Sequence, residues 1–425
     1  MEYAFLTSAL VTGAAIMLLR PVAPHIRLVD QPSARKAHDG AVPLVGGLAI
    51  FAALVPLLVV AGPVANGAAL LAGGILLVVV GAVDDAHHVG PKTRLFVQGT
   101  AILILALYGG TVLESLGNLG LGGAEIRTGW LALGFTIFAG LGLVNAVNMA
   151  DGVDGLSGML SMVTLAALAI VAAVAGRADE LLIIAVLGGA LAGFLAFNLR
   201  LPGRRQALVF LGDAGSYLVG FLIFYLLVRL SQGPRPAMSP VTALWLTLVP
   251  LFDTVGMMLR RLRKGRSPFR ADREHLHHIF LLAGFTPNET VATLTTAAGL
   301  AATIGLAGLY LGIPDAVMLL LFLILAAGYY RAIMRAWTVM RFLSRSICRR
   351  NIARDRRSGR DRRHRHAPAI VAVVGEDRRA GDERRRHIDR RTNPPTGLEG
   401  GPPEPSIARR EQVEEEPARP THSTT

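Results

Sequence analysis

Long apolar segments follow one another through the first 345 residues of this chain, and short polar stretches separate them. A helix needs about 20 mostly apolar residues to cross the hydrocarbon core of a bilayer. The first segment has no basic residue before its apolar core, so it reads as a span and not as a cleaved signal peptide. We therefore predict an all-α, polytopic integral membrane protein with about 11 transmembrane helices, at residues 4–20, 42–62, 66–83, 95–113, 130–147, 156–175, 181–198, 207–229, 240–259, 290–311 and 314–332.

Basic residues are distributed unevenly between alternate loops of this pattern. With the N-terminus outside, the inner loops hold sixteen Lys and Arg residues, and the outer loops hold four: Arg127, Arg177, Arg229 and Arg235. Lys and Arg gather on the cytoplasmic side of membrane proteins. We therefore expect an outside N-terminus and a cytoplasmic C-terminus. We attribute the net charge of +13 to membrane topology and to attraction for anionic lipid. Nucleic-acid binding is disfavoured, because no recognition module is visible.

The composition changes after residue 345. Residues 351–425 are rich in Arg, Asp, Glu and Pro, as in RDRRSGRDRR and EQVEEEP. Segments of this kind bury too little apolar surface to fold alone. We predict a membrane-embedded domain over 1–345 and a disordered, charged cytoplasmic tail over 351–425. The tail is interpreted as a solvated segment attracted to anionic lipid, with protein docking as the alternative. The single cysteine, Cys348, excludes an internal disulfide.

Acidic, amide, basic and histidine side chains gather in the loops expected inside the cell and at the adjoining helix ends. Polar residues near bilayer depth are costly, so a cluster of them indicates a functional site. Carboxylates and amides are hard oxygen ligands suited to Mg²⁺ or Mn²⁺, whereas Lys and Arg bind phosphates. This combination suits phosphoryl transfer. The segments concerned are 30–47, 84–94, 145–158, 210–216 and 253–278.

The spacing of the acids adds some geometry. Asp84 and Asp85 are adjacent, so on a helix they point about 100° apart, and we expect different roles for them. Asn148 and Asp151 are three residues apart and would be neighbours on a helix, which Gly152 and Gly155 then break. No GxxxxGK[ST] sequence occurs, which argues against a P-loop nucleotide hydrolase.

The same segments carry ordered motifs. They read RKAHDGAVPLVGG, VDD followed by PKTR, NAVNMADGVDGLSG, FLGDAGS, SPVTALW, PLFD, RRLRKGRSPF, and HLHH followed by AGFTP. In this order the chain resembles the polyprenyl-phosphate N-acetylhexosamine-1-phosphate transferase superfamily over residues 1–345. It is most similar to the WecA-type undecaprenyl-phosphate GlcNAc-1-phosphate transferases, and more distantly to MraY of peptidoglycan synthesis.

The resemblance implies a role for each residue that matches a motif. Asp213 and Asn148 would hold a metal ion, which is Mg²⁺ with Mn²⁺ as the alternative. The residues expected beside the reacting groups, as catalytic residues, are Asp84, Asp85, Lys92, Asp151, Asp154, His277 and His278. The residues expected to bind substrate are Arg35, Lys36, Gly46, Gly47, Arg94, Asn145, Gly152, Gly212, Arg266 and His275.

The resemblance also implies a reaction. N-acetylglucosamine 1-phosphate would pass from UDP-GlcNAc to undecaprenyl phosphate with release of UMP, as the first membrane step of a cell-surface polysaccharide pathway such as lipopolysaccharide O-antigen. A phosphate monoester has a second pKa of about 6, so a general base is not obligatory. A two-step route through an aspartyl intermediate stays open. The site would lie on the cytoplasmic face of the inner membrane. Membrane lipids and a second copy of the chain, as a homodimer, are further expected partners.

Several alternatives stay open at this point. A sister transferase would use UDP-GalNAc, UDP-QuiNAc or a similar donor. A transporter or lipid flippase is disfavoured. Transporters tend to place ionisable groups at the bilayer midplane and to contain inverted repeats, whereas the acids of this chain lie in the loops expected inside the cell and at the adjoining helix ends. Individual acids also allow a structural interpretation. For Asp253, an ion pair with Arg260 or Arg261 is as well supported as a functional role. Gly46 and Gly47 serve helix packing in the plainer reading. For the HLHH histidines, zinc binding is a minor alternative. For Arg260–Arg266, the alternative is a positively charged anchor that only fixes the topology.

Overall fold

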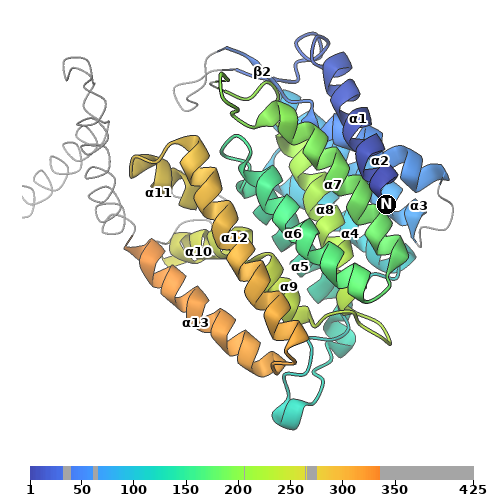
Figure 1. Ribbon diagram of the computed structural model, residues 1–425, viewed down its shortest axis with the longest axis vertical. Coiled ribbons are helices and arrows are strands. Elements are labelled where there is room, and N and C mark those ends of the chain that lie inside the picture. The colour runs from blue at the N-terminus through green and yellow to red at the C-terminus, as the bar shows by residue number, and fades with distance from the viewer. Residues whose placement is uncertain (32–39, 61–65, 205, 264, 266–274, 336–425) are drawn as a thin grey trace, which may run out of the picture. The chain divides into compact units, whose positions relative to one another are not determined.

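The computed structural model describes residues 1–31, 40–60, 66–204, 206–263, 265 and 275–335. Within them the chain is mostly helical, with one antiparallel pair of short strands in which Val29 pairs with Pro43 and Asp30 with Val42. The elements are α1 (Glu2–Leu19), β1 (Val29–Asp30), β2 (Val42–Pro43), α2 (Gly46–Val60), α3 (Gly67–His87), α4 (Pro91–Tyr108), η1 (Leu121–Gly123), η2 (Gly129–Leu131), α5 (Ala132–Met149), α6 (Leu156–Val174), α7 (Ala178–Asn198), α8 (Gly212–Ser231), α9 (Pro240–Leu246), α10 (Leu248–Arg263), α11 (Leu276–Leu282), α12 (Pro287–Tyr310) and α13 (Asp315–Met334) (Figure 1).

Eight of the described helices are long and apolar enough to cross a membrane: α1, α3, α5 with η2, α6, α7, α8, α12 and α13. The bent pair α9 and α10 makes nine if it counts as one span. Helices α2 and α4 occupy two further segments in which we expected spans. The chain is thus a multi-pass membrane protein, while the count of eleven and the orientation of the termini stay predictions. The expected tail at 351–425 lies outside the described residues.

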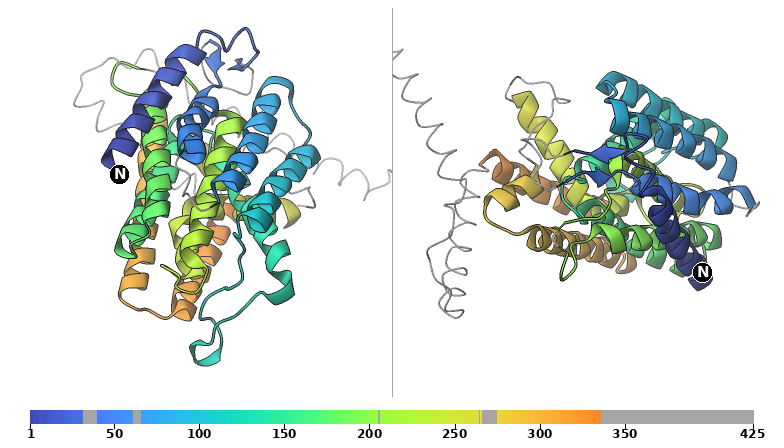
Figure 2. Two further views of the ribbon diagram at one scale, coloured as in Figure 1. Left: turned by 90° about the vertical axis from the view of Figure 1, so that its right-hand side faces the viewer. Right: turned by 90° about the horizontal axis from the view of Figure 1, so that it is seen from above.

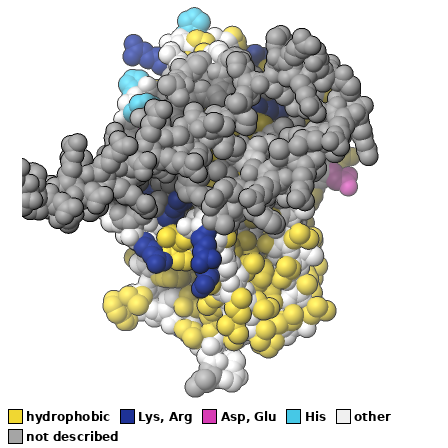
Figure 3. Space-filling model, turned by 90° about the vertical axis from the view of Figure 1, so that its left-hand side faces the viewer, with side chains coloured by type: hydrophobic (Ala, Val, Ile, Leu, Met, Phe, Trp, Pro, Cys, Tyr) yellow, Lys and Arg dark blue, Asp and Glu magenta, His cyan; other side chains and the backbone are white. Residues whose placement is uncertain are grey.

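The surface of the bundle agrees with a lipid environment. Only 17% of α1 and of α13 is buried, although both helices are strongly apolar. Leu10 and Tyr3 of α1 and Leu320 and Ile324 of α13 are exposed. One face shows hydrophobic side chains over its lower part, with Lys, Arg and His side chains above (Figure 3). Apolar helices at the edge of the bundle therefore face lipid, and one end of the bundle is polar.

Helix α8 is the centre of the bundle. It packs against α2, α3, α5, α6, α7 and α9, and nearly all of its side chains are buried. The surrounding helices lie beside it in the views of Figure 2. Two contacts bring backbone onto backbone at its first turn: a methyl group at Gly47 would collide with Gly215, and one at Gly81 would collide with Ala214. Glycine is required because only it allows this close approach.

Helices α9 and α10 meet at an angle of 85° around Thr247. The segment expected as a span over 240–259 is therefore two helices with a bend between them, and it remains a span only if the pair crosses the membrane as one. Pro250 is the physical reason, because it lacks the N–H that would bond to the carbonyl of Leu246. Thr164 of α6 instead donates its hydroxyl to that carbonyl at 2.9 Å. The bend turns α10 towards α13, with which it packs.

Candidate active site

Asp84 and Asp85 lie in the last turn of α3, and the structure gives them different partners. Asp84 is buried, and its carboxylate accepts from the Val89 N–H at 2.7 Å and from Arg94 Nη1 at 2.8 Å. Asp85 accepts from the N–H of Asp213 at 3.0 Å and of Ala214 at 3.4 Å. The expectation that the two acids point apart is confirmed. Asp84 joins α3 to α4, and Asp85 joins α3 to the start of α8.

The close packing of α3 on α8 brings Asp85 to this place. Gly81 touches Ala214, and Asp85 follows one helical turn later. Gly212 adopts a left-handed conformation with φ of 73°. A methyl group there would lie 2.5 Å from Asp85 Oδ2. Gly212 thus supplies both the backbone turn that starts α8 and the room for the carboxylate.

Asp213 lies at the centre of a group of polar side chains. Asn148 Nδ2 donates to its Oδ1 at 2.6 Å and to Ser216 Oγ at 2.9 Å. Arg94 Nη1 lies 3.9 Å from the second carboxylate oxygen of Asp213. Tyr217 adds its hydroxyl, which lies 3.4 Å from Asp84 Oδ2 and from Arg94 Nη1. Three motifs that are distant in sequence therefore meet at one place.

Asp151 and Asp154 lie in the turn between α5 and α6 and differ in their contacts. Arg200 Nε donates to Asp154 Oδ2 at 2.6 Å, and the Ala207 N–H donates to the same oxygen at 3.1 Å. Asp154 thus has the ion-pairing role left open by the sequence. Helix α5 ends at Met149, before Asp151, so the expected helical pairing with Asn148 is replaced by a turn.

The charge around Asp151 is negative. Burial, together with the charges of Asp213, Asp85 and Asp154, raises the pKa of Asp151 well above its ordinary value. No described residue donates a hydrogen bond to its carboxylate. A divalent cation would offset this excess of negative charge.

The HLHH motif meets the same turn. His277, on α11, is buried, and its Nε2 has no hydrogen-bond partner among the described residues. A methyl group at Gly152 would collide with this nitrogen, so the two residues touch. Burial, followed by the neighbouring His278, lowers the pKa of His277 to about 3. His277 is therefore neutral at physiological pH and offers a neutral imidazole.

His275 precedes α11 and is held by an acid of α10. Its Nδ1 donates to Asp253 Oδ2 at 3.0 Å, and Asp253 Oδ1 accepts from the Leu276 N–H at 2.8 Å. The His275 ring is stacked on that of His277, with centroids 5.7 Å apart. The HLHH motif is thus one packed unit between α10 and the turn after α5.

The other candidate residues lie at various distances from this group. Gly46 and Gly47 are buried, and their N–H groups donate to the carbonyls of Phe210 and Leu211, which gives them the packing role. Asn145 donates to Gln98 Oε1 at 2.8 Å, between α5 and α4. Lys92 is exposed in the first turn of α4. Arg35, Lys36 and Arg266 lie outside the described residues.

Sequence reasoning missed three residues that complete the site, Ser216, Tyr217 and Arg200, and it left the role of a fourth, Asp253, open. Ser216 and Tyr217 follow Asp213 by three and four residues, so a helix starting at GDAGS would have placed them on the same face. Arg200 was counted only for topology. The sequence suggested Arg260 or Arg261 as ion-pair partners of Asp253, whereas its described partners are His275, Leu276 and Tyr329.

The described residues contain no group of three or more His, Cys, Asp or Glu side chains placed to hold a metal ion by themselves. Zinc, which takes such sets, has no such group there. Mg²⁺ is usually held by one or two carboxylates together with substrate phosphates. The donor set of Asp213 and Asn148, with the charge excess at Asp151, fits that kind of site.

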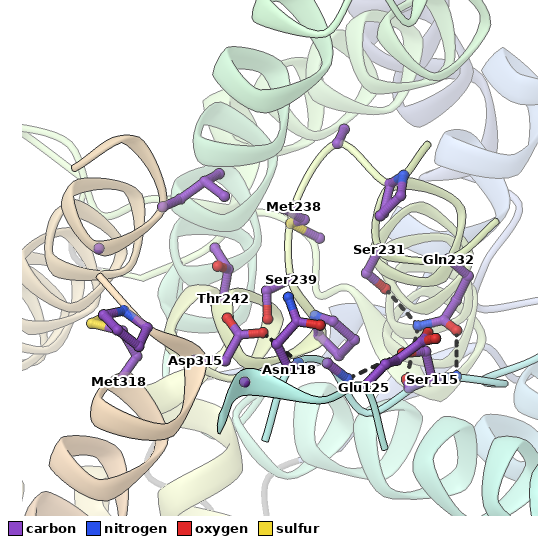
Figure 4. A pocket seen from close by; sticks show the side chains of 18 of the residues that line it. Ser115, Asn118, Glu125, Ser231, Gln232, Met238, Ser239, Thr242, Asp315 and Met318 are labelled. Atoms are coloured by element: carbon purple, nitrogen blue, oxygen red, sulfur yellow. Dashed lines mark hydrogen bonds between the residues drawn. The ribbon is translucent and has the colours of Figure 1, made fainter. Parts of the chain in front are cut away.

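A cavity of about 740 Å³ lies away from these residues. It is lined by the segment after α4, the α8–α9 connection and the start of α13 (Figure 4). Several of its charged groups have partners in the protein, because Arg127 lies 3.1 Å from Glu114 and Asp315 accepts from the Asn118 N–H at 2.8 Å. None of the site candidates lines this cavity.

Known proteins with similar sequences place these motifs in context. The model of the family described as Glycosyl transferase family 4 matches residues 68–231. An undecaprenyl-phosphate alpha-N-acetylglucosaminyl 1-phosphate transferase of Yersinia pestis is 41% identical over 334 residues, which cover 78% of this chain and 91% of the relative. Its counterpart in Escherichia coli O157:H7 is 38% identical, covering 82% and 94%. That of Pasteurella multocida is 37% identical, covering 80% and 96%.

Proposed function

Because this chain belongs to glycosyl transferase family 4, we propose that it transfers N-acetylglucosamine 1-phosphate from UDP-GlcNAc to undecaprenyl phosphate and releases UMP. Relatives with this activity in their names match about four fifths of the chain at 37–41% identity. The observation that carries the proposal is the meeting of Asp84, Arg94, Asp213 and Asn148 within hydrogen-bond or ion-pair distance.

The chemistry requires one bond to form and one to break. An oxygen of the lipid phosphate attacks the phosphorus that carries the sugar, and the bond from this phosphorus to the UMP oxygen breaks. UMP leaves with the bonding electron pair. The lipid phosphate is mostly dianionic at neutral pH, since its second pKa is about 6. The protein therefore has to position two anions and offset their charge.

A divalent cation would bind at Asp213 and Asn148. Asn148 donates its amide nitrogen to Asp213 and Ser216, which leaves its carbonyl oxygen as the hard donor. When bound, Mg²⁺ or Mn²⁺ would neutralise charge on the diphosphate and on the leaving group. The raised pKa of Asp151 supports a cation at this place: burial is its main cause, and the negative charges of Asp213, Asp85 and Asp154 add to it.

The residues of the chain have distinct tasks in this proposal. Arg94 holds Asp84 and adds a positive charge beside Asp213. Lys92, two residues before it and exposed, is free to reach a phosphate. His277, which is neutral, offers a hydrogen bond to the sugar or the diphosphate and no positive charge. Asp151 borders the same space.

A direct attack is favoured over an aspartyl intermediate. All four carboxylate oxygens of Asp84 and Asp85 accept hydrogen bonds from the protein. Such bonds hold each carboxylate oxygen in place and occupy a lone pair that nucleophilic attack would need. Both acids therefore act as structural and electrostatic elements that hold α4 and α8 beside the phosphates.

We also propose that the site faces the cytoplasm. The candidate residues lie at the ends of α3, α5 and α8 that border the basic inner loops of the predicted topology. Arg200 and Arg94 belong to these loops and contact the acids of the site. A nucleotide sugar made in the cytoplasm would reach the site from this side, and the lipid from the bilayer.

The test is UMP release by the purified protein with UDP-GlcNAc, undecaprenyl phosphate and Mg²⁺, beside reactions without lipid and with EDTA. Release that needs both lipid and metal is expected. Release only with another UDP-N-acetylhexosamine would keep the reaction and change the donor. Absence of release with every donor, from folded protein, would refute the transferase.

A further inference from the structure

We propose that Asp253 is a positioning residue, which acts through His275 to fix the HLHH histidines against the turn after α5. The inference rests on the proposed transferase and adds a residue to its site. Asp253 lies on α10 and is 6% exposed. The 85° bend before α10 carries its carboxylate to the region between α11 and α13.

The carboxylate holds the start of α11 at two points. Oδ2 accepts from His275 Nδ1 at 3.0 Å, and Oδ1 accepts from the Leu276 N–H at 2.8 Å. One bond fixes the ring of His275, and the other fixes the first backbone N–H of the helix. Because the carboxylate accepts from Nδ1, this nitrogen of His275 carries a proton.

A third group fixes the carboxylate itself. Tyr329 of α13 donates its hydroxyl to Asp253 Oδ1 at 3.3 Å. Its ring also touches Gly256, one turn further along α10, where a methyl group would lie 2.8 Å from a ring carbon. The position of Asp253 is therefore determined by packing between α10 and α13 and does not depend on its contact with His275.

The positioning effect of Asp253 extends to the turn after α5 through the rings of His275 and His277. His275 and His277 are stacked with an angle of 3° between their planes. His277 in turn touches Gly152, which follows Asp151. Asp253 itself makes no described contact with Asp84, Asp85 or Asp213. It therefore acts on the site by setting where the HLHH histidines lie, as residues behind a ligating or binding histidine do.

The experiment is a double-mutant cycle on UMP release, with D253N, H275Q and the double variant. Asn keeps the volume of the side chain and an oxygen for the Leu276 N–H, and it loses the carboxylate oxygen that accepts from His275. We expect D253N to lower kcat about 10- to 100-fold, the usual cost of removing such a partner. KM for the lipid should stay within about twofold, because His277 on α11 is proposed to bond to the sugar or the diphosphate of the donor.

Coupling is the decisive readout. If Asp253 acts through His275, the double variant should be no more than about threefold slower than H275Q alone. D253E, which keeps the carboxylate, should recover activity relative to D253N even though the longer side chain strains a buried site. D315N is the matched control: this Asp also accepts a backbone N–H, from Asn118, and it lies in the other cavity.

Each outcome decides something. Losses that multiply in the double variant would overturn the positioning role while leaving the transferase intact. Activities that simply follow the melting temperatures of the variants would overturn it as well, because a purely structural contact behaves in that way. A folded wild-type protein that releases no UMP with any donor would remove the proposed function, and this inference with it.

Discussion

The carboxylate of Asp85 accepts a hydrogen bond from the backbone N–H of Asp213 at 3.0 Å, although 128 residues separate them. The contact joins the end of α3 to the first turn of α8, where backbone N–H groups have no partner within the helix. It places Asp213, the proposed metal ligand, at a fixed position relative to the acids of α3. The site depends on this junction, and the following predictions test its parts.

Replacing Asp213 by Asn should abolish turnover, with a loss of about a thousandfold or more, because a neutral amide cannot balance the charge of a divalent cation. The protein should remain folded, since Asn148 can still bond to the side chain and Ser216 to the backbone carbonyl of residue 213. UMP release and thermal melting in detergent measure the two effects. Full activity of D213N would refute the metal assignment, and D315N provides the same chemical change outside the site.

Gly212→Ala should inactivate the protein through two effects. Its φ of 73° costs a non-glycine residue about 1–2 kcal/mol, and the methyl group would lie 2.5 Å from Asp85 Oδ2. Gly203 is the matched control, because its φ is 85° and nothing lies within 4 Å of its methyl position. G203A should lower the melting temperature and keep activity. Equal activities of G212A and G203A would contradict the role of the Asp85 contact.

Arg94→Lys keeps the charge but removes Nη1, the nitrogen that lies beside Asp84, Asp213 and Tyr217. We expect turnover to fall about 10- to 100-fold, since the shorter Lys side chain does not bring its ammonium to the place of Nη1. Arg127→Lys, at an exposed pair with Glu114, should change little. If R94K and R127K are equally active, only the charge of Arg94 matters.

Acidification should destabilise the folded protein through His277. Its pKa falls from an ordinary 6.5 to about 3 in the folded state, so the unfolded chain binds more protons between these values. Stability is then lost as pH falls below about 6.5, by at most about 1.4 kcal/mol per pH unit for one proton.

The measurement is the melting temperature of wild type and H277Q between pH 7.5 and 4.5. H277Q should lose less stability over this range than the wild-type protein. Replacement of the exposed His25 by Gln is the matched control for the loss of a histidine outside the site. A wild-type curve that runs parallel to that of H277Q would show that His277 titrates normally.

Hydrophobicity alone determined the class of this protein. A run of about 20 apolar residues can satisfy its backbone in a membrane only as a helix. Each predicted span therefore overlaps a helix, the one over 240–259 as the bent pair α9 and α10. The motif residues at the span ends, such as Asp84 and Asp213, were placed at the polar end of the bundle. Sequence spacing also predicted that Asp84 and Asp85 point apart, because adjacent residues on a helix do.

Tertiary structure decided which of these residues act together. Asp154 is an ion-pair partner of Arg200, and Asp253, which seemed as suited to pairing with an arginine of its own helix, instead holds His275. Neither assignment is local, since each depends on how helices far apart in the chain pack. The bend at Thr247 is also tertiary, because Pro250 weakens the helix there while Thr164 of another helix takes up the carbonyl that Pro250 leaves. Sequence periodicity reports which face of a helix is apolar, and only packing selects the partner that each polar side chain meets.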